Sequence, residues 1–149
     1  MKIAIGCDHG GFRLKNAVIE HLEKRGMEVK DFGTYTEESC DYPEFAQKVA
    51  EEVVAKNYEF GIVICGTGIG VSITANKVPG ARAALCHDTF SAHATREHNN
   101  ANILAMGERV IGVGLALEVV DTFLGAEFEG GRHERRIDKI AEVEKKYYK

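Results

Sequence analysis

With 149 residues, 44% of them hydrophobic, the chain can bury a core without disulfides or a structural metal, and we expect one domain over residues 1–149. A net charge of −4 argues against a general nucleic-acid binder, and no apolar run approaches the roughly 18 residues of a membrane span. The N-terminal Met-Lys-Ile-Ala-Ile is too short for a signal-peptide core, so we expect a cytoplasmic protein with no membrane partner.

Short apolar runs alternate with helical stripes along the whole chain. In chain order, strands are expected at residues 2–7, 28–32, 60–65, 81–86 and 103–106. The helices that follow them are expected at 12–25, 42–56, 69–77, 90–97 and 110–124, and a charged helix at 132–148 ends the chain. This alternation predicts a doubly wound α/β domain, in which helices cover both faces of a parallel sheet.

The third strand runs directly into a glycine-rich turn, Cys65-Gly66-Thr67-Gly68-Ile69-Gly70. Glycines at alternate positions leave the backbone open to a ligand and permit angles that other residues adopt only with strain. The helix expected after the turn would place unpaired N–H groups beside Cys65. Such groups favour a thiolate and can also hold an oxyanion or a phosphate.

Several chemistries could use this cysteine. A phosphatase of the Cys-x5-Arg type needs an arginine where Val71 stands, and a dinucleotide site needs its third glycine at that same position. A cysteine hydrolase with His98 or His9 as its base stays open. Proton transfer with the thiolate as general base stays open as well.

The remaining cysteines give weaker signals. Cys7 and Cys86 close apolar runs and are interpreted as small buried hydrophobic residues, whereas Cys40 lies in a polar loop. The cysteines and the six histidines show no metal-ligand spacing, so we expect reduced thiols and no metal.

Three arginines crowd the start of the last helix, where they oppose its dipole. Arg132 and Arg136 are four residues apart and share one helix face, whereas Arg135 projects about 100° away from Arg136. The cluster is either a solvated charged face or a site for a dianion such as phosphate, which forked guanidinium groups bind well. Arg109 is a further candidate for this role.

A third cluster, Glu97-His98-Asn99-Asn100, lies where the fourth helix is expected to end. Its histidine and asparagines can be structural, but His98 could also shuttle a proton to a sugar ring oxygen, and Asn99 could bind an oxyanion. Because ligands bind beyond the carboxyl ends of parallel strands, we expect Asp8, the Cys65 turn and His87 to share one rim. The arginine anchor is expected at the same rim.

Together these motifs resemble the type B ribose-5-phosphate isomerases. The matching stretches follow the family's order through nearly the whole chain, at residues 6–11, 41–43, 65–70, 75–82, 96–102 and 132–138. The resemblance implies a Rossmann-like α/β/α sandwich with a five-stranded parallel sheet. It also implies a homodimer with its site at the subunit interface, and leaves a tetramer open.

The activity implied by the resemblance is interconversion of D-ribose 5-phosphate and D-ribulose 5-phosphate through a cis-enediolate, a step of the pentose phosphate pathway, without metal or organic cofactor. Cys65 would be the base that moves a proton between C2 and C1, and Thr67 and His98 would assist ring opening. The substrate-binding residues implied are Asp8, His9, Tyr42, Gly66, Gly68, Gly70, Asn99, Arg109, Arg132, His133 and Arg136.

Within this set, the resemblance assigns distinct tasks. The amides of residues 66–70 and Asn99 would hold the enediolate oxygen, and Asp8 and Tyr42 would contact sugar hydroxyls. The phosphate would be taken by residues 109, 132, 133 and 136, with His9 close by. His98, Asn99 and Arg109 would come from the other subunit.

Two alternatives remain open from the sequence. The first is an isomerase of a six-carbon aldose phosphate such as allose 6-phosphate. The second is a non-catalytic nucleotide-binding domain that uses residues 66–70 for phosphates and Asp88 for a ribose.

Overall fold

Five parallel strands form a single sheet in the order β2-β1-β3-β5-β4. The computed structural model describes residues 1–148. The strands are β1 (Lys2–Cys7), β2 (Glu28–Asp31), β3 (Phe60–Cys65), β4 (Ala83–Leu85) and β5 (Ile103–Gly107). The predicted five-stranded parallel sheet is therefore confirmed.

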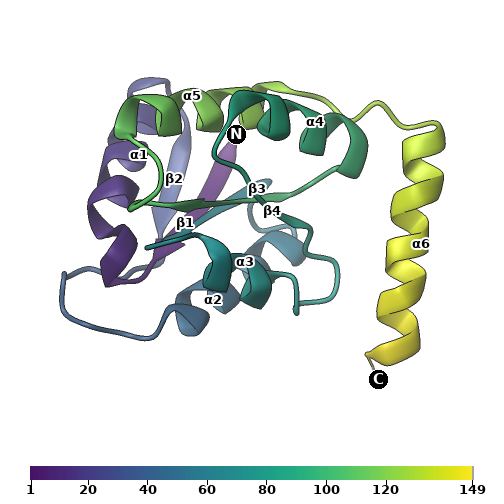
Figure 1. Ribbon diagram of the computed structural model, residues 1–149, viewed down its shortest axis with the longest axis horizontal. Helices are drawn as coiled ribbons and strands as arrows, with labels where there is room; N and C mark the ends of the chain where they lie inside the picture. The colour runs from purple at the N-terminus through teal and green to yellow at the C-terminus, as the bar shows by residue number, and fades with distance from the viewer. Residues whose placement is uncertain (149) are drawn as a thin grey trace.

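Helices cover both faces of this sheet (Figure 1). They are α1 (Phe12–Lys24), α2 (Tyr42–Val54), α3 (Ile69–Ala75), α4 (Thr89–Asn99), α5 (Val113–Gly125) and α6 (Arg132–Tyr147), with a short 3-10 helix η1 (His9–Gly11) before α1. α1, α4 and α5 lie on one face and α2 and α3 on the other (Figure 1). No helix within residues 1–148 combines the length and apolar character that a bilayer crossing requires.

The central strands are buried on both sides, which explains their continuous apolar runs. In β1, Ile3 and Ile5 face the core under α1 and α5, and Ala4 faces the core under α2 and α3. In β3, Ile62 and Ile64 belong to the first core, whereas Val63 belongs to the second. The sheet is thus held by two separate apolar layers.

Most helix ends differ from the sequence prediction by one or two residues, and two differences concern segments next to the site. α4 continues to Asn99 because Asn100 adopts the left-handed conformation that ends it (φ 47°, ψ 43°), so His98 lies on the last helical turn. α5 begins at Val113 and not at residue 110. Residues 110 and 111 instead donate their N–H groups to the carbonyl of Gly107 in a tight turn.

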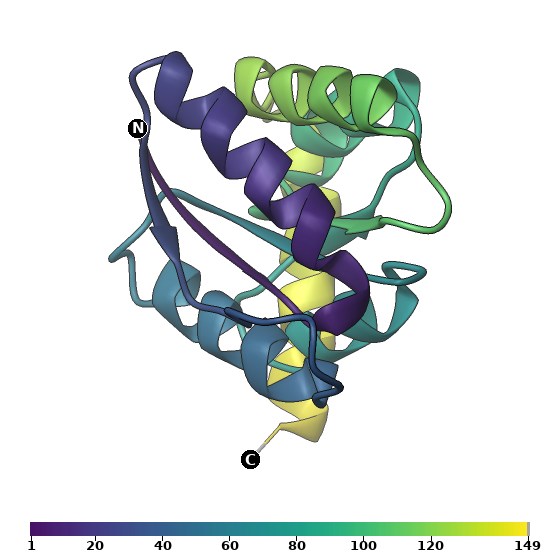
Figure 2. The same cartoon turned by 90° about the vertical axis from the view of Figure 1, so that its left-hand side faces the viewer.

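The last helix, α6, stands apart from the layers at the right-hand edge of Figure 1 and packs against α4. Seen from the left-hand side of that view, α6 lies behind the sheet (Figure 2). Three apolar side chains of α6, Ile140, Val143 and Tyr147, are exposed. A helix with an exposed apolar stripe is typical of an interface with another chain.

The turn after β3 packs tightly on the end of β5. Gly68 has φ 77°, and a Cβ atom there would lie 2.5 Å from Cδ1 of Leu85 and 2.7 Å from the carbonyl carbon of Met106. Both the backbone angle and the close approach therefore require glycine at this position.

We predict that Gly68→Ala lowers the free energy of unfolding by about 2 kcal/mol or more, because it combines left-handed strain with a backbone clash. The matched control is Gly114→Ala, near the start of α5, where nothing lies within 4 Å of the added Cβ. That variant should be neutral or more stable by about 0.5 kcal/mol. Urea unfolding of both variants measures the difference, and equal stabilities would contradict this view of the turn.

Candidate active site

Three strand ends meet at the carboxyl edge of the sheet. Cys7 pairs with Ile64, and Cys65 pairs with Gly107 on the next strand. The N–H of Gly107 in turn donates to Nε2 of His87 at 2.8 Å. The prediction that the turns after β1, β3 and β4 share one rim is confirmed.

Cys65 lies at the junction of β3 and the glycine-rich turn and is only 5% exposed. The backbone N–H of Gly68 points at its sulfur, with 3.1 Å between N and Sγ. The hydroxyl oxygen of Thr67 accepts from the N–H of Ile69 at 3.2 Å, which closes the turn. The sulfur therefore accepts a hydrogen bond from the backbone at the residue that precedes α3.

The thiols of Cys7 and Cys86 have a different environment. Both are buried, and burial raises the pKa of Cys7 to about 12 and the pKa of Cys86 to about 11. These two thiols stay protonated at neutral pH, which agrees with the structural interpretation of both. All four cysteines are unpaired.

A cavity of about 420 Å³ opens over the turn. It is lined by Asp8, Tyr42, Cys65, Gly66, Thr67, Ile69, Gly70 and Ile73. The ring of Tyr42 lies directly on Gly70, where a Cβ atom would come within 2.5 Å of the ring. The carboxylate of Asp8 is held by the N–H of Gly10 at 2.8 Å. The cavity thus places a thiol, a hydroxyl, a phenol and a carboxylate around one space.

A buried lysine holds the loop of residues 32–41 at the carboxyl edge of the sheet. Lys15 is fully buried, and its ammonium group donates to Asp31 at 2.8 Å and to the carbonyl of Thr34. Further along the loop, the N–H of Cys40 donates to Nδ1 of His9 at 3.2 Å. A neutral His9 therefore carries its proton on Nε2.

Arg109 lies beside the Cys65 turn of its own chain. Its backbone N–H donates to the carbonyl of Gly66 at 3.0 Å, and its side chain passes over Gly66. The resemblance had placed Arg109 in the other subunit. It reaches this turn because it directly follows β5, which pairs with β3.

A second group of site residues gathers where α4 ends and α6 begins. We call His98, Glu129 and His133 the imidazole cluster. The two rings stack with centroids 4.3 Å apart and an interplanar angle of 15°. The pKa of His133 is lowered, first by desolvation of its buried ring and then by the charges of His98, Arg132 and Arg136.

The imidazole cluster lies at the opposite edge of the sheet from Cys65. The loop after α4 is bound to the amino ends of the strands, since the carbonyl of Asn102 accepts from the N–H of Gly61, the second residue of β3. Cys65 ends that same strand four residues later, roughly 13 Å away at about 3.3 Å per residue. The expectation that Arg132 and Arg136 share the rim of Cys65 is therefore wrong within one chain. α5 returns the chain to the amino edge before α6 starts.

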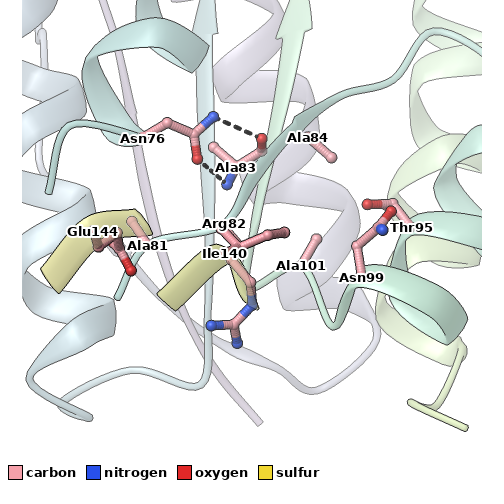
Figure 3. A pocket seen from close by; sticks show the side chains of 10 residues that line it. All are labelled: Asn76, Ala81, Arg82, Ala83, Ala84, Thr95, Asn99, Ala101, Ile140 and Glu144. Carbon is pink, nitrogen blue, oxygen red and sulfur yellow. Dashed lines mark hydrogen bonds between the residues drawn. The ribbon is translucent and has the colours of Figure 1, made fainter. Parts of the chain in front are cut away.

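Asn99 lies on this amino-edge side as well, in a groove of about 380 Å³ between α6 and the body of the protein. Figure 3 shows Asn99, Thr95 and Ala101 on one side of the groove and the α6 residues Ile140 and Glu144 on the other. A carboxylate oxygen of Glu144 accepts from the N–H of Gly80 at 3.0 Å, which ties α6 to the loop before β4. The groove is lined by four alanines together with polar and charged side chains that include Arg82 and Glu144.

The sequence interpretation missed Glu129. Its carboxylate oxygen lies 3.6 Å from Nε2 of His98 and 3.5 Å from Nε2 of His133. Glu129 and His133 are four residues apart, and this spacing could have indicated a pair of metal ligands. His98 is distant in the sequence and comes close to them only in the folded chain. These are the three side chains of the described residues that could together hold a metal ion.

Comparisons with known proteins agree with this geometry. Residues 3–140 match the family model described as Ribose/Galactose Isomerase. A solved structure of ribose-5-phosphate isomerase B from Clostridium thermocellum is 61% identical, with a TM-score of 0.98 and 99% of each chain covered. Ribose-5-phosphate isomerase B of Escherichia coli is 50% identical, with 97% of each chain covered. D-erythrulose-4-phosphate isomerase of Pectobacterium atrosepticum is 44% identical over 97% of this chain and 95% of the relative. The chain therefore belongs to the ribose/galactose isomerase family.

Proposed function

We propose that this protein interconverts D-ribose 5-phosphate and D-ribulose 5-phosphate, with Cys65 as the base. The observation that carries the proposal is the sulfur of Cys65 at the foot of the cavity, with the N–H of Gly68 at 3.1 Å. The names of the Clostridium thermocellum and Escherichia coli relatives support the choice of substrate.

In the proposed reaction, the thiolate removes the proton from C2 of the open-chain aldose and returns it to C1. The electron pair of the C2–H bond forms the C1=C2 bond of an enediolate, and the charge moves to O1. Transfer of the O2 proton to O1 and return of the thiol proton to C1 then form the C2=O2 bond of the ketose and regenerate the thiolate. Backbone amides of the turn at residues 66–70 would stabilise the charged oxygen, as donors do in an oxyanion hole.

Sugar contacts follow from the lining of the cavity. Asp8 and Tyr42 face the space above Cys65 and would bind hydroxyl groups, and Thr67 would assist opening of the ring. Arg109 lies over Gly66 and His9 lies on the adjoining turn, so both are close enough to contribute to phosphate binding.

The remaining proposed groups require a second copy of the chain, since His98, Asn99, Arg132, His133 and Arg136 lie at the other edge of the sheet. Exposed apolar side chains adjoin both halves of the site: Ile69 and Ile73 line the Cys65 cavity, and Ile140 lines the groove under α6. We infer a homodimer in which the α3 side of one copy meets the α6 side of the other. A two-fold arrangement of this kind forms two equal sites.

The Pectobacterium relative supports a second candidate, an isomerase of a four-carbon sugar phosphate. The two candidates use the same base and the same turn and differ only in the length of sugar between C1 and the phosphate. Isomerase assays with four-, five- and six-carbon sugar phosphates at equal concentration decide between them, with the highest kcat/KM expected for ribose 5-phosphate.

We predict that Cys65→Ala lowers kcat by about a thousandfold or more, because it removes the base, while a five-carbon sugar phosphate still binds. Cys40→Ala is the matched control, since it removes a second thiol but keeps the backbone N–H that binds His9. Steady-state kinetics and calorimetric binding measure the two effects. Turnover by Cys65→Ala near that of the unmodified protein would remove Cys65 from this role.

We also predict that Arg136→Ala raises KM and weakens inhibition by inorganic phosphate by about tenfold or more, because a charge-assisted bond to the phosphate is lost. Arg135→Ala is the control, since its side chain points about 100° around the helix and should leave both constants nearly unchanged. Equal effects of the two substitutions would show that α6 supplies only general positive charge.

A further inference from the structure

We propose that the imidazole cluster binds a divalent transition-metal cation such as Zn²⁺, and that the bound cation inhibits the enzyme. The site consists of one ring nitrogen each of His98 and His133 and a carboxylate oxygen of Glu129, and these ligand atoms all lie within 4.8 Å of one another. The inhibition, though not the binding, depends on the function proposed above for His98.

The distances fit ligands of one ion better than they fit hydrogen bonds. Glu129 Oε1 lies 3.6 Å from His98 Nε2 and 3.5 Å from His133 Nε2. A polar contact of about 3.6 Å is too long for a hydrogen bond. With metal–ligand bonds of about 2.0–2.2 Å, two ligands of a tetrahedral zinc ion lie about 3.4 Å apart. The two nitrogen–oxygen distances are therefore close to the ligand–ligand spacing of such a site.

The three ligands come from three segments that backbone hydrogen bonds hold in register. His98 lies on the last turn of α4. The N–H of Glu129 donates to the carbonyl of Glu97 at 3.1 Å, and the N–H of His133 donates to the carbonyl of Gly130 at 3.1 Å. His133 is buried, whereas the side chains of His98 and Glu129 are about half exposed. In a single chain an ion can therefore reach the three ligands from solvent, and in the proposed dimer it can reach them through the substrate cavity.

Binding requires one rearrangement. The two rings are nearly parallel, so their lone pairs do not yet converge on one point. Rotation of the half-exposed His98 ring about its Cβ–Cγ bond would turn its Nε2 toward the ion while the buried ring of His133 stays in place. A metal-bound His98 could neither donate nor accept a proton at that nitrogen, and this is the physical basis of the proposed inhibition.

The surrounding charge selects the kind of cation. Arg132 and Arg136 lie close enough to affect His133 electrostatically, and they oppose any cation. Ions that bind mainly through charge to oxygen, such as Mg²⁺ and Ca²⁺, should therefore bind poorly. Zn²⁺, Co²⁺, Ni²⁺ and Cu²⁺ bind strongly to imidazole nitrogen and can overcome this repulsion.

The test is calorimetric titration of tag-free, metal-stripped protein with Zn²⁺ in phosphate-free buffer, with the visible spectrum of a Co²⁺ complex as a second measurement. One ion should bind per chain, and Co²⁺ should show tetrahedral bands without a sulfur-to-metal charge-transfer band. Glu129→Gln should weaken Zn²⁺ binding by about tenfold or more. Glu127→Gln, which changes an exposed acid in the same loop, should leave binding unchanged.

The proposed metal site would be wrong if no Zn²⁺ bound at millimolar concentration, or if Glu129→Gln bound Zn²⁺ as tightly as the unmodified protein. It would also be wrong if a sulfur-to-metal charge-transfer band placed the ion on a cysteine. His98→Asn, at a half-exposed position, is a second variant that should lose affinity if the first does not fold. Inhibition is measured separately, as the ratio of activity with and without Zn²⁺ in each variant. Binding without inhibition would overturn only the inhibitory role, and absence of any isomerase activity would overturn the proposed function and leave the binding result standing.

Discussion

The contact between the turn after β3 and the end of β5 is the constraint on which the rest of the structure depends. Gly68 adopts a left-handed conformation against Met106, and Gly107 lies against the backbone of Thr67, so neither position has room for a side chain. This contact aims the N–H of Gly68 at Cys65. It also sets Arg109, two residues after Gly107, over the same turn, since Arg109 is bound to the carbonyl of Gly66. Chemistry at the rim thus rests on two glycines and on the register of two strands.

Most of the fold could be predicted from the sequence because the relevant signals are local. Strands buried on both faces produce unbroken apolar runs such as residues 60–65, and helices with one buried face produce periodic stripes. The shared rim of Asp8, Cys65 and His87 followed from one rule about parallel strands. Burial of Cys7 and Cys86 followed from their positions at the ends of apolar runs.

What could not be predicted depends on contacts between distant segments. α4 ends at Asn99 because Asn100 adopts a left-handed conformation. α5 starts late because the N–H groups of residues 110 and 111 both donate to the carbonyl of Gly107. No periodicity indicates toward which edge of the sheet α6 projects. The arginines of α6 therefore looked like partners of Cys65, although α5 carries them to the opposite edge. Glu129 was overlooked for the same reason, since its imidazole neighbours come from two different helices.

The separation of the two halves gives oligomerisation a chemical role in the proposed function. Within one chain, Cys65 and His98 lie at opposite ends of the sheet, and a second copy would supply to each cavity the residues that its own chain cannot.

Subunit mixing tests this claim most directly, with Cys65→Ala and His98→Ala proteins that are inactive alone. If sites are shared, subunit exchange should restore about a quarter of the unmodified activity, because half of the random dimers then contain one intact site. No recovery, despite mixed dimers demonstrated by mass spectrometry, would contradict a site built from two chains.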